Sequence, residues 1–225
     1  MVQVNLGSKI LGANDLLARQ NRSLFASEGL LALNLMSSPG SGKTTLLERT
    51  LEVLKGQIRI GVIEGDLYTD QDARRIEDKG APVIQINTEG GCHLDADMVG
   101  QSYKKIAGKL DIVVIENVGN LVCPAEFDLG EDIRVVVLST TEGNDKPLKY
   151  PLAFRQAQVI VVNKMDLLPY TDFNVNRFSH DIIELNPTAR VFFVSARSGE
   201  GIDEWCEWLL EEAERKREAA GDGRG

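Results

Sequence analysis

Short apolar runs recur along the chain and are separated by longer stretches in which apolar residues follow helical spacing. The runs are rich in valine, isoleucine and leucine and occupy residues 30–36, 58–63, 83–86, 111–115, 133–138, 159–162 and 191–194. Apolar runs that alternate with helices predict a parallel sheet that is buried on both faces. We therefore predict an α/β fold of three layers, with a mostly parallel sheet and helices on both faces.

The stretches between the runs predict the helices. Residues 8–29 place apolar side chains at roughly helical spacing, and we interpret residues 1–29 as an N-terminal helical extension. Further helices are expected over residues 45–54, 70–79, 95–109, 173–185 and 202–216. No repeat or linker interrupts this pattern, so we predict a single domain over residues 1–217 and a disordered tail, rich in glycine and charge, over residues 218–225.

The first apolar run leads into a glycine-rich turn and then into a helical pattern. The turn reads Ser37-Ser38-Pro39-Gly40-Ser41-Gly42-Lys43-Thr44-Thr45. A strand, such a loop and a helix together are typical of the phosphate-binding P-loop, whose strict motif begins with Gly where this chain has Ser37. Inward N–H groups and the helix N-terminus favour an anion there. We expect the phosphates to contact Gly40, Ser41, Gly42, Lys43, Thr44 and Thr45.

Two later strand ends carry the pattern of a guanine-binding site. They read Asn163-Lys164-Met165-Asp166 and Ser195-Ala196-Arg197. They resemble the Asn-Lys-x-Asp and Ser-Ala-Lys elements of the GTPase superfamily, with Arg197 in place of the usual Lys. A buried Asp166 carboxylate accepts hydrogen bonds from guanine N1–H and N2–H₂, and adenine would leave it unpaired. We expect the base to contact Asn163, Lys164, Asp166, Ser195, Ala196 and Arg197, with the Ala196 N–H donating to guanine O6.

Carboxylates near other strand ends are expected to complete the site. Mg²⁺ needs oxygen ligands beside the β- and γ-phosphates, and we assign Thr44, Asp66 and Glu116 to it, with Glu64 and Asp70 as alternatives to Asp66. Glu116-Asn117-Val118-Gly119 stands where GTPases carry Asp-x-x-Gly, so Gly119 is expected to sense the γ-phosphate. The expected catalytic set is Lys43, Asp66, Glu116 and Gly119.

The rate of hydrolysis is expected to be low. Asn120 follows Gly119, where signalling GTPases carry the Gln that orients water. The sequence shows no arginine that is obviously placed as an internal finger. We therefore predict slow, Mg²⁺-dependent intrinsic hydrolysis of GTP to GDP and phosphate.

The overall charge narrows the possible partners. A net charge of −9 and a pI near 4.9 argue against binding to nucleic acid or to an anionic membrane surface. No apolar stretch approaches the roughly 18 residues of a membrane span, and the N-terminus lacks the features of a signal peptide. Three cysteines do not make a disulfide framework, so we expect a cytoplasmic location.

A second kind of chemistry is indicated by Cys92, His93 and Cys123. Thiolates and imidazole are suitable ligands for Zn²⁺ or Ni²⁺, and Gly90 and Gly91 allow Cys92 and His93 to turn to the same side. The alternative, which the spacing alone does not exclude, is two small buried cysteines and a loop histidine. Cys206 and His180 are interpreted as structural residues.

Three motifs together resemble the HypB family of nickel-incorporation GTPases, and the likeness covers nearly the whole chain. The motifs are residues 91–95 (Gly-Cys-His-Leu-Asp), 116–124 (Glu-Asn-Val-Gly-Asn-Leu-Val-Cys-Pro) and 145–151 (Asp-Lys-Pro-Leu-Lys-Tyr-Pro). The resemblance implies a P-loop NTPase fold of the SIMIBI class that assists nickel insertion into [NiFe]-hydrogenase. It implies that Cys92, His93 and Cys123 bind nickel or zinc near the interface of a homodimer that GTP favours.

The resemblance also implies partners: hydrogenase-maturation proteins and the hydrogenase large subunit. It places Lys146 and Lys149 near the interface, within possible reach of the neighbour's nucleotide. The N-terminal Cys-rich or His-rich nickel motifs of some members are absent, so storage of nickel is not expected. Three other readings stay open: a urease-type nickel GTPase, although its Cys-Pro-His motif is absent, a small-molecule P-loop kinase, and a metal-binding module that does not depend on nucleotide.

Overall fold

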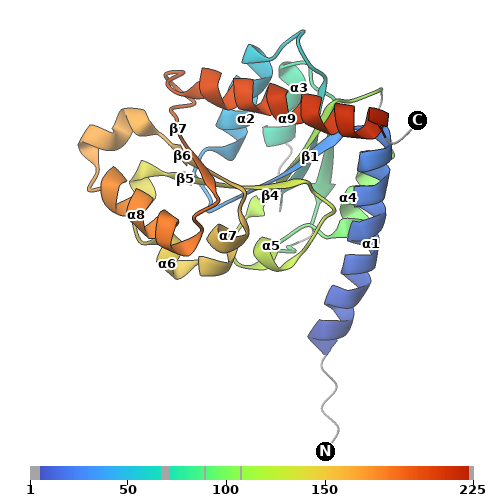
Figure 1. Ribbon diagram of the computed structural model, residues 1–225, viewed down its shortest axis with the longest axis horizontal. Coiled ribbons are helices and arrows are strands. Elements are labelled where there is room, and N and C mark those ends of the chain that lie inside the picture. The colour runs from blue at the N-terminus through green and yellow to red at the C-terminus, as the bar shows by residue number, and fades with distance from the viewer. Residues whose placement is uncertain (1–5, 67–70, 89, 107, 223–225) are drawn as a thin grey trace, which may run out of the picture.

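The computed structural model describes residues 6–66, 71–88, 90–106 and 108–222, with the backbone alone described at residues 6–10, 66 and 222. These residues form a seven-stranded sheet in the order β3-β2-β4-β1-β5-β6-β7, and neighbouring strands are parallel (Figure 1). The predicted α/β fold is confirmed. The strands are β1 (Leu31–Ser37), β2 (Ile60–Asp66), β3 (Val83–Asn87), β4 (Ile112–Gly119), β5 (Ile133–Ser139), β6 (Val159–Asn163) and β7 (Arg190–Phe193).

Helices cover both faces of this sheet, as the alternating pattern predicted (Figure 1). On one face lie α2 (Lys43–Val53), α3 (Gln71–Asp78) and α9 (Ile202–Asp222). The other face carries α1 (Leu6–Glu28), α4 (Ala96–Tyr103), α5 (Cys123–Glu126), α7 (Pro151–Gln156) and α8 (Val175–Leu185). Short helical segments complete the connections: α6 (Lys146–Lys149), η1 (Thr140–Glu142) and η2 (Met165–Tyr170).

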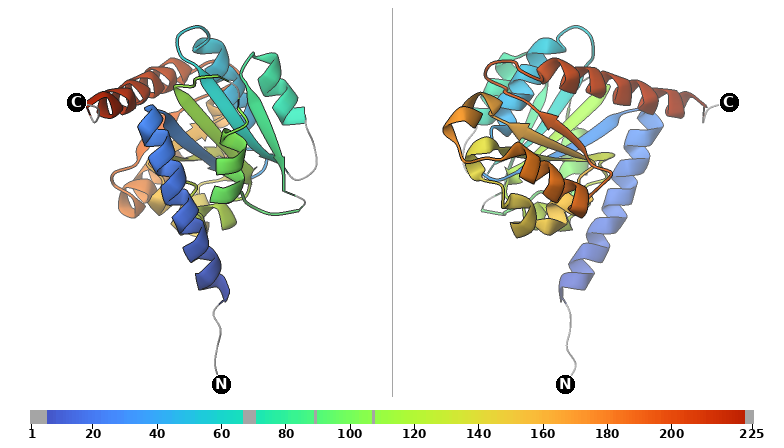
Figure 2. Two further views of the ribbon diagram at one scale, coloured as in Figure 1. Left: turned by 90° about the vertical axis from the view of Figure 1, so that its right-hand side faces the viewer. Right: turned by 60° about the vertical axis from the view of Figure 1, so that its left-hand side comes forward.

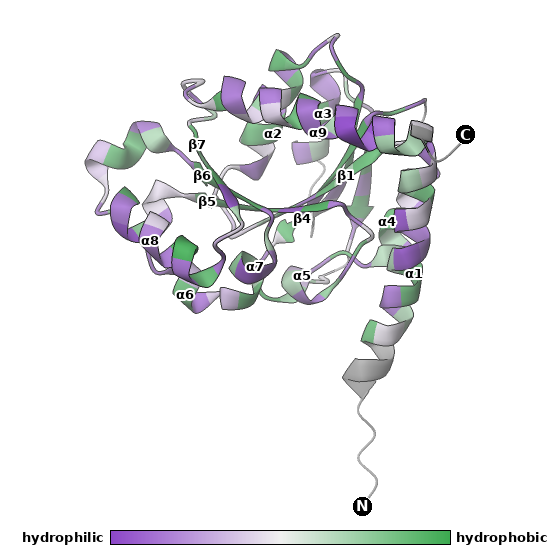
Figure 3. Ribbon diagram, viewed as in Figure 1, coloured by the Kyte–Doolittle hydropathy of each residue, from purple (hydrophilic) through white to green (hydrophobic). Residues whose placement is uncertain are grey.

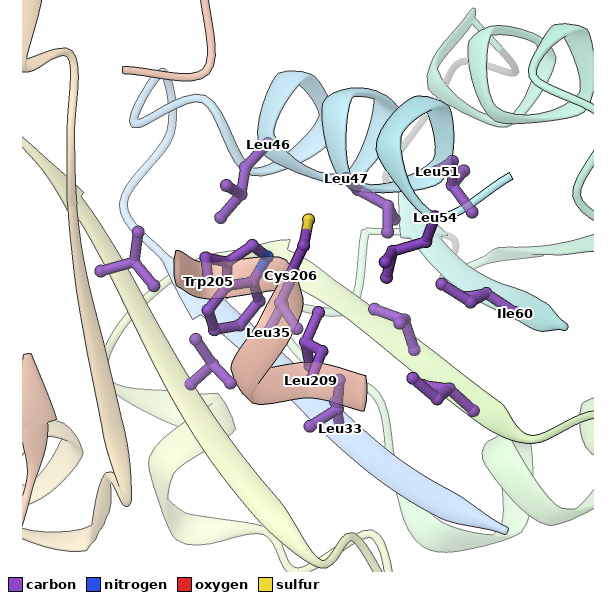
Figure 4. Packing of buried hydrophobic residues seen from close by; sticks show 14 of the residues in the cluster. Leu33, Leu35, Leu46, Leu47, Leu51, Leu54, Ile60, Trp205, Cys206 and Leu209 are labelled. Atoms are coloured by element: carbon purple, nitrogen blue, oxygen red, sulfur yellow. The ribbon is translucent and has the colours of Figure 1, made fainter. Parts of the chain in front are cut away.

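The core between the sheet and the α2–α9 layer fixes the helix that begins at the glycine-rich loop. Leu46 and Leu47 of α2 are buried against Trp205 and Leu209 of α9, above the side chains of β1 (Figure 4). The Trp205 indole Nε1–H donates a hydrogen bond to Thr50 Oγ1 at 3.0 Å, so this large side chain is buried without losing its polar partner. Hydrophobic residues line the strands, whereas α1 and α9 alternate hydrophobic and hydrophilic positions (Figure 3). The packing holds α2 against the strand from which the loop departs.

Helix α1 is tied to the domain by buried amides as well as by apolar contacts. It lies beside α4 along one edge of the molecule (Figure 2). Asn14 Oδ1 accepts from the Ala96 N–H at 2.9 Å, and Asn21 Nδ2 donates to the carbonyls of Ala96 and Leu129 at 2.7 and 3.0 Å. Asn14 and Asn21 are both buried. The predicted N-terminal extension is therefore anchored at the start of α4.

Two helix boundaries differ by more than two residues from the sequence prediction. Helix α4 ends at Tyr103, since the N–H groups of Lys105 and Ile106 make turn hydrogen bonds instead of helical ones. Helix α9 continues to Asp222, so residues 218–222 are helical and the prediction of a tail from residue 218 is wrong for them. Ion pairs spaced three and four residues apart join residues 211–217, in the turns of α9 that precede this extension. Residues 223–225 lie outside the described residues.

No helix in the described part of the chain is both long enough and apolar enough to cross a membrane.

Candidate functional site

The glycine-rich loop follows β1 at the carboxyl end of the sheet and is packed against the end of β6. Gly42 has a φ of 91°, and a Cβ there would lie 2.6 Å from Asn163 Nδ2, so a side chain would be both strained and in collision. Asn163 Nδ2 donates to the Ser41 carbonyl at 3.0 Å. Lys164 Nζ donates to the Gly40 carbonyl at 2.6 Å. The loop and the Asn-Lys-x-Asp element are therefore one structural unit, although they are far apart in the sequence.

A cavity of about 460 Å³ opens above this loop. It is lined by the loop itself and by polar groups from β2, α3 and β4, which include Glu64, Asp72, Glu116 and Gly119. Ligands of open parallel sheets bind beyond the carboxyl ends of the strands, and this cavity occupies that place. Its dimensions and its loop suit a polyphosphate.

Glu116 is the buried carboxylate of this cavity. It is 3% exposed; its Oε1 accepts a hydrogen bond from Thr44 Oγ1 at 2.7 Å and lies 3.9 Å from Lys43 Nζ. Burial raises the pKa of Glu116, and the nearby Lys43 ammonium and Thr44 hydroxyl oppose that rise. Its Oε2 has no hydrogen-bond partner among the described residues. A buried carboxylate with an open oxygen, beside the P-loop hydroxyl, fits a divalent cation such as Mg²⁺.

A second carboxylate lies next to Glu116 in the sheet. Glu64 of β2 is the parallel register partner of Glu116, is 2% exposed and lines the same cavity. The backbone of Asp66 ends β2, but its side chain lies outside the described residues, as does Asp70. The predicted assignment of Asp66 to magnesium therefore stays a prediction, with Glu64 at the cavity as its described alternative.

A smaller cavity of about 310 Å³ adjoins the phosphate cavity. The two share Gly42, Thr45 and Lys164 in their walls. The smaller cavity is lined further by Asn163, Asp166, Leu167, Ala196 and Arg197. A contiguous pair of cavities, one polar and glycine-lined and the other walled by the Asn-Lys-x-Asp turn, has the layout expected for a nucleotide.

The polar groups of the smaller cavity are held by one another. Ser195 Oγ donates to Asp166 Oδ1 at 2.6 Å, which orients the carboxylate. The Ala196 N–H, which we expected from the sequence to donate to guanine O6, donates to Asn163 Oδ1 at 3.1 Å. Lys164 has a φ of 62°, a conformation that non-glycine residues rarely adopt. The turn therefore holds backbone strain at the place where it faces the cavity.

Cys92, His93 and Cys123 come together on the other side of β4. Their ligand atoms all lie within 4.8 Å of one another, and Cys92 Sγ is 3.5 Å from His93 Nδ1. The His93 ring stacks on Phe127 with centroids 3.9 Å apart. Burial lowers the pKa of His93, which favours the neutral imidazole that binds metals. The hydrogen bond with Cys123, followed by burial, raises the pKa of the Cys92 thiol.

The remaining cysteine and histidine take no part in this cluster. Cys206 is 2% exposed in the core under α9, and burial raises the pKa of its thiol to about 12. His180 lies on α8 with an exposed side chain beside Asp181 and Glu184. Both positions agree with the structural interpretation of these residues.

The two sites are joined through the end of β4. Asn120 forms an antiparallel backbone bridge with Ser37 at the start of the glycine-rich loop. Its side-chain Nδ2 donates to the Cys92 carbonyl at 3.4 Å, and its Oδ1 accepts from the Val122 N–H at 2.8 Å. Gly119, which lines the phosphate cavity, lies against Pro39 of the loop. The segment 116–123 therefore touches both sites.

One cationic side chain at the cavity was not found from the sequence. Arg75 of α3 lines the phosphate cavity and donates to Thr45 Oγ1 at 3.2 Å, to Asp72 Oδ1 at 2.7 Å and to Glu48. The only sequence signal for it is the spacing of Asp72 and Arg75 on one helical face. Lys146 Nζ donates to Ser38 Oγ at 3.1 Å, so it contacts the loop of its own chain. Lys149 is exposed and paired with Asp145 at 2.5 Å.

The fold and the paired cavities define a P-loop nucleotide-binding protein with a thiol–imidazole cluster beside its phosphate site. Comparison with known proteins agrees with this class. Residues 31–193 match the family described as "CobW/HypB/UreG, nucleotide-binding domain". The chain is 52% identical to the hydrogenase maturation factor HypB of Azotobacter chroococcum over 221 residues, which are 97% of this chain and 70% of that protein. It is 53% identical to HypB of Escherichia coli strain K12 over 203 residues, 89% of this chain and 69% of that protein.

Solved structures extend the likeness to three dimensions. The crystal structure of HypB from Helicobacter pylori in complex with nickel matches with a TM-score of 0.86 and 38% identity, over 91% of this chain and 97% of that one. HypB from Archaeoglobus fulgidus matches with a TM-score of 0.85 and 39% identity, over 90% of this chain and 100% of that one. The chain therefore belongs to the CobW/HypB/UreG family and, within it, to the hydrogenase maturation factors HypB.

Proposed function

We propose that this protein is a GTP-hydrolysing nickel chaperone that assists nickel insertion into [NiFe]-hydrogenase and whose affinity for metal depends on the bound nucleotide. The observation that carries the proposal is the shared end of β4. Glu116 and Gly119 line the phosphate cavity, while Cys123, a few residues further along, belongs to the thiol–imidazole cluster. If the loop after Gly119 changes its conformation when the γ-phosphate is lost, the metal ligand Cys123 would move with that loop.

Guanine is the base that the smaller cavity favours. Asp166 offers a carboxylate that Ser195 already orients, and its two oxygens suit the adjacent N1–H and N2–H₂ donors of guanine. Lys164 lines the same cavity, where its aliphatic stem can cover the base. An adenine in this place would leave the carboxylate without donors, which is an effective means of rejection.

Thr44 and Glu116, together with Asp66, would hold Mg²⁺. The ion would neutralise charge on the β- and γ-phosphates when it is bound. Lys43 would reach the same oxygens from the loop. Each of these groups would bind or orient the phosphates.

Slow hydrolysis is supported by the position of Asn120. In signalling GTPases the corresponding side chain is free to orient the attacking water. Here both ends of the Asn120 amide are occupied, one by the Cys92 carbonyl and the other by the Val122 N–H. The side chain therefore links the loops and is not available for water. A turnover above about 1 s⁻¹ by the isolated protein would contradict this assignment.

In this proposal the transferred metal is the cargo of the protein. Cys92, His93 and Cys123 supply three ligands for Ni²⁺ or Zn²⁺, which leaves a coordination position open for transfer or for a second subunit. Exposed apolar side chains lie nearby on adjoining short helices: Val122 before α5, Leu148 on α6 and Leu152 on α7. We propose that this face forms a homodimer when GTP is bound, and that hydrogenase-maturation proteins and the hydrogenase large subunit are the further partners.

One titration tests the proposal. Ni²⁺ and Zn²⁺ are titrated into the protein in the presence of GDP or of a non-hydrolysable GTP analogue, and the mass of the oligomer is followed throughout. We expect metal affinities that differ between the two nucleotide states, and a dimer with the analogue. Identical affinities in both states would contradict the proposed control by nucleotide, and metal binding that Lys43→Ala leaves unchanged in both states would favour a simple metal-binding module.

A second acceptor is worth including. The relative from Helicobacter pylori, 39% identical over 96% of this chain and 89% of that protein, is named a hydrogenase/urease maturation factor HypB. Release of metal to a urease apoprotein in the same assay would extend the proposed function to that acceptor.

A further inference from the structure

Asn117 is a buried amide between the two sites. It lies on β4 between Glu116 and Val118, is 1% exposed and lines the phosphate cavity. Its Oδ1 accepts two hydrogen bonds, from the Leu94 N–H at 3.1 Å and from the Val118 N–H at 3.0 Å. Its Nδ2 donates to Asn34 Oδ1 at 3.3 Å. One oxygen atom is therefore shared between the strand that leads to the phosphate-sensing turn and the loop that carries the metal ligands.

Leu94 is the other half of this contact. It follows His93 directly and is fully buried. Its side chain lies on Gly65 of β2, where an added Cβ would come within 2.9 Å of Leu94 Cγ. Gly65 also lines the phosphate cavity. Leu94 is thus held through its backbone by Asn117 and through its side chain by Gly65, and both of these residues line the phosphate cavity.

The chemistry of an amide explains why asparagine occupies this position. The oxygen must accept from two backbone N–H groups while the other end of the side chain donates to Asn34. An aspartate would add a third buried carboxylate beside Glu64 and Glu116, which are also lodged in the cavity wall. An alanine would leave the Leu94 N–H buried without its acceptor.

We propose that Asn117 is a positioning residue that couples the phosphate cavity to the metal-binding loop through the Leu94 N–H. This inference rests on the proposed function, because it names the residue through which the nucleotide controls the metal. When the γ-phosphate moves the turn that includes Val118 and Gly119, the shared oxygen moves with it, and Leu94 and His93 follow. The covalent tether from Gly119 to Cys123 acts on one thiol, whereas Asn117 acts on the Cys92–His93 side of the same cluster.

A purely structural role for Asn117 makes a different prediction. A buried amide that only stabilises the fold would, when removed, weaken metal binding equally with either nucleotide. A coupling residue changes the ratio of the two affinities. The ratio is therefore the decisive measurement.

The test uses the full chain with Asn117→Ala and a matched control, Asn34→Ala. Asn34 is fully buried on β1, and its side chain hydrogen-bonds to Asn117 and Glu131, but it is not among the residues that line the phosphate cavity. The Ni²⁺ affinity is measured by competition with a chromogenic chelator, with GDP and with a non-hydrolysable GTP analogue. Circular dichroism and thermal unfolding show that each variant is folded, and Asn117→Ser replaces Asn117→Ala if the latter does not fold.

In the wild-type protein we expect the two Ni²⁺ affinities to differ by about fivefold or more. In Asn117→Ala that ratio should fall to within about twofold of one, whereas Asn34→Ala should retain it. A ratio that Asn117→Ala leaves unchanged would overturn the inference while the proposed function stands. Equal loss of the ratio in both variants would assign the effect to general loosening of the core and would also overturn it. A wild-type ratio of one would overturn the proposed function itself and this inference with it.

Discussion

The hydroxyl of Thr44 donates a 2.7 Å hydrogen bond to the Glu116 carboxylate, so the P-loop and β4 meet at one buried oxygen. Lys43 stands 3.9 Å from the same oxygen. The Thr44 hydroxyl and the Lys43 ammonium both stabilise the negative charge of the buried Glu116 carboxylate. Burial of this charge is unfavourable, and a bound cation would offset that cost.

Glu116→Gln should therefore stabilise the nucleotide-free protein and weaken its binding of Mg²⁺–nucleotide. Because burial raises the pKa of Glu116, its carboxyl binds a proton more readily in the native state than in the unfolded chain. The contribution of the protonated carboxyl to the free energy of unfolding is complete at low pH and is lost as the pH rises through the raised pKa. The melting temperature of Glu116→Gln relative to wild type should thus increase as pH rises from the ordinary carboxyl range toward the raised pKa, while the affinity for Mg²⁺–nucleotide falls about tenfold or more.

Glu52→Gln is the matched control for this experiment. Glu52 also lies on the α2 side of the molecule, but it is exposed and pairs with Arg49 and Lys79 outside the phosphate cavity. The substitution Glu52→Gln makes the same change of charge as Glu116→Gln and should leave nucleotide binding unaltered. A nucleotide-free Glu116→Gln protein that is less stable than wild type at neutral pH would contradict the argument.

Asp166→Asn should change the preferred base. In the proposed function the carboxylate pairs with two donors of guanine, whereas the asparagine amide offers one donor and one acceptor, which match the 2-oxo group and N1–H of xanthine. GTP affinity should fall about a hundredfold and xanthosine triphosphate should become the better ligand. Competition binding with both nucleotides measures the ratio of the two affinities in Asp166→Asn and in the wild-type protein. The exposed Asp172→Asn serves as control, and an unchanged preference for guanine in Asp166→Asn would place the base elsewhere.

Arg75→Ala should weaken GTP binding. The guanidinium pairs with Glu48 and with Asp72, which lines the phosphate cavity, so its removal takes a positive charge from the cavity and leaves the Asp72 carboxylate there without this partner. We expect a loss of affinity of about tenfold, which is larger for GTP than for GDP and decreases at high salt. Arg74→Ala changes an exposed arginine on the same helix and should have little effect. Equal losses in the two variants would show that only the net charge of α3 matters.

Thiol labelling should separate the three cysteines. Cys92 and Cys123 are partly exposed, whereas Cys206 is buried with its pKa raised to about 12. Iodoacetamide at about pH 8 should therefore modify Cys92 and Cys123 in the native protein and Cys206 only after unfolding, because the thiolate is the reactive form. Added Ni²⁺ should protect the first two, as peptide mass mapping would show. Rapid native labelling of Cys206, or full labelling of Cys92 and Cys123 in the presence of nickel, would contradict the assigned cluster.

Local patterns in the sequence were sufficient for the order of strands and helices along the chain and for the class of fold. The apolar runs predicted β1, β5 and β6 to within a residue or so, since buried strands are nearly continuous runs of apolar side chains. The run at 111–115 was extended by the structure through Gly119, so Glu116 and Asn117 are strand residues. Polar side chains such as these do not predict a strand from the local sequence, and pairing with the neighbouring strands β1 and β2 places the segment in the sheet.

By itself the sequence determined which groups could bind phosphate and guanine, because the P-loop and the Asn-Lys-x-Asp turn are each a short motif whose chemistry lies in adjacent residues. It could not show which distant residues meet. The sheet order places β2 and β1 on either side of β4, and this brings Glu64 beside Glu116 and the Cys92–His93 loop beside Cys123. Arg75 and Asn117 reach their sites for the same reason. Long-range packing of helices and strands determines the partners of these two residues, and the spacing of residues along the chain does not reveal that packing.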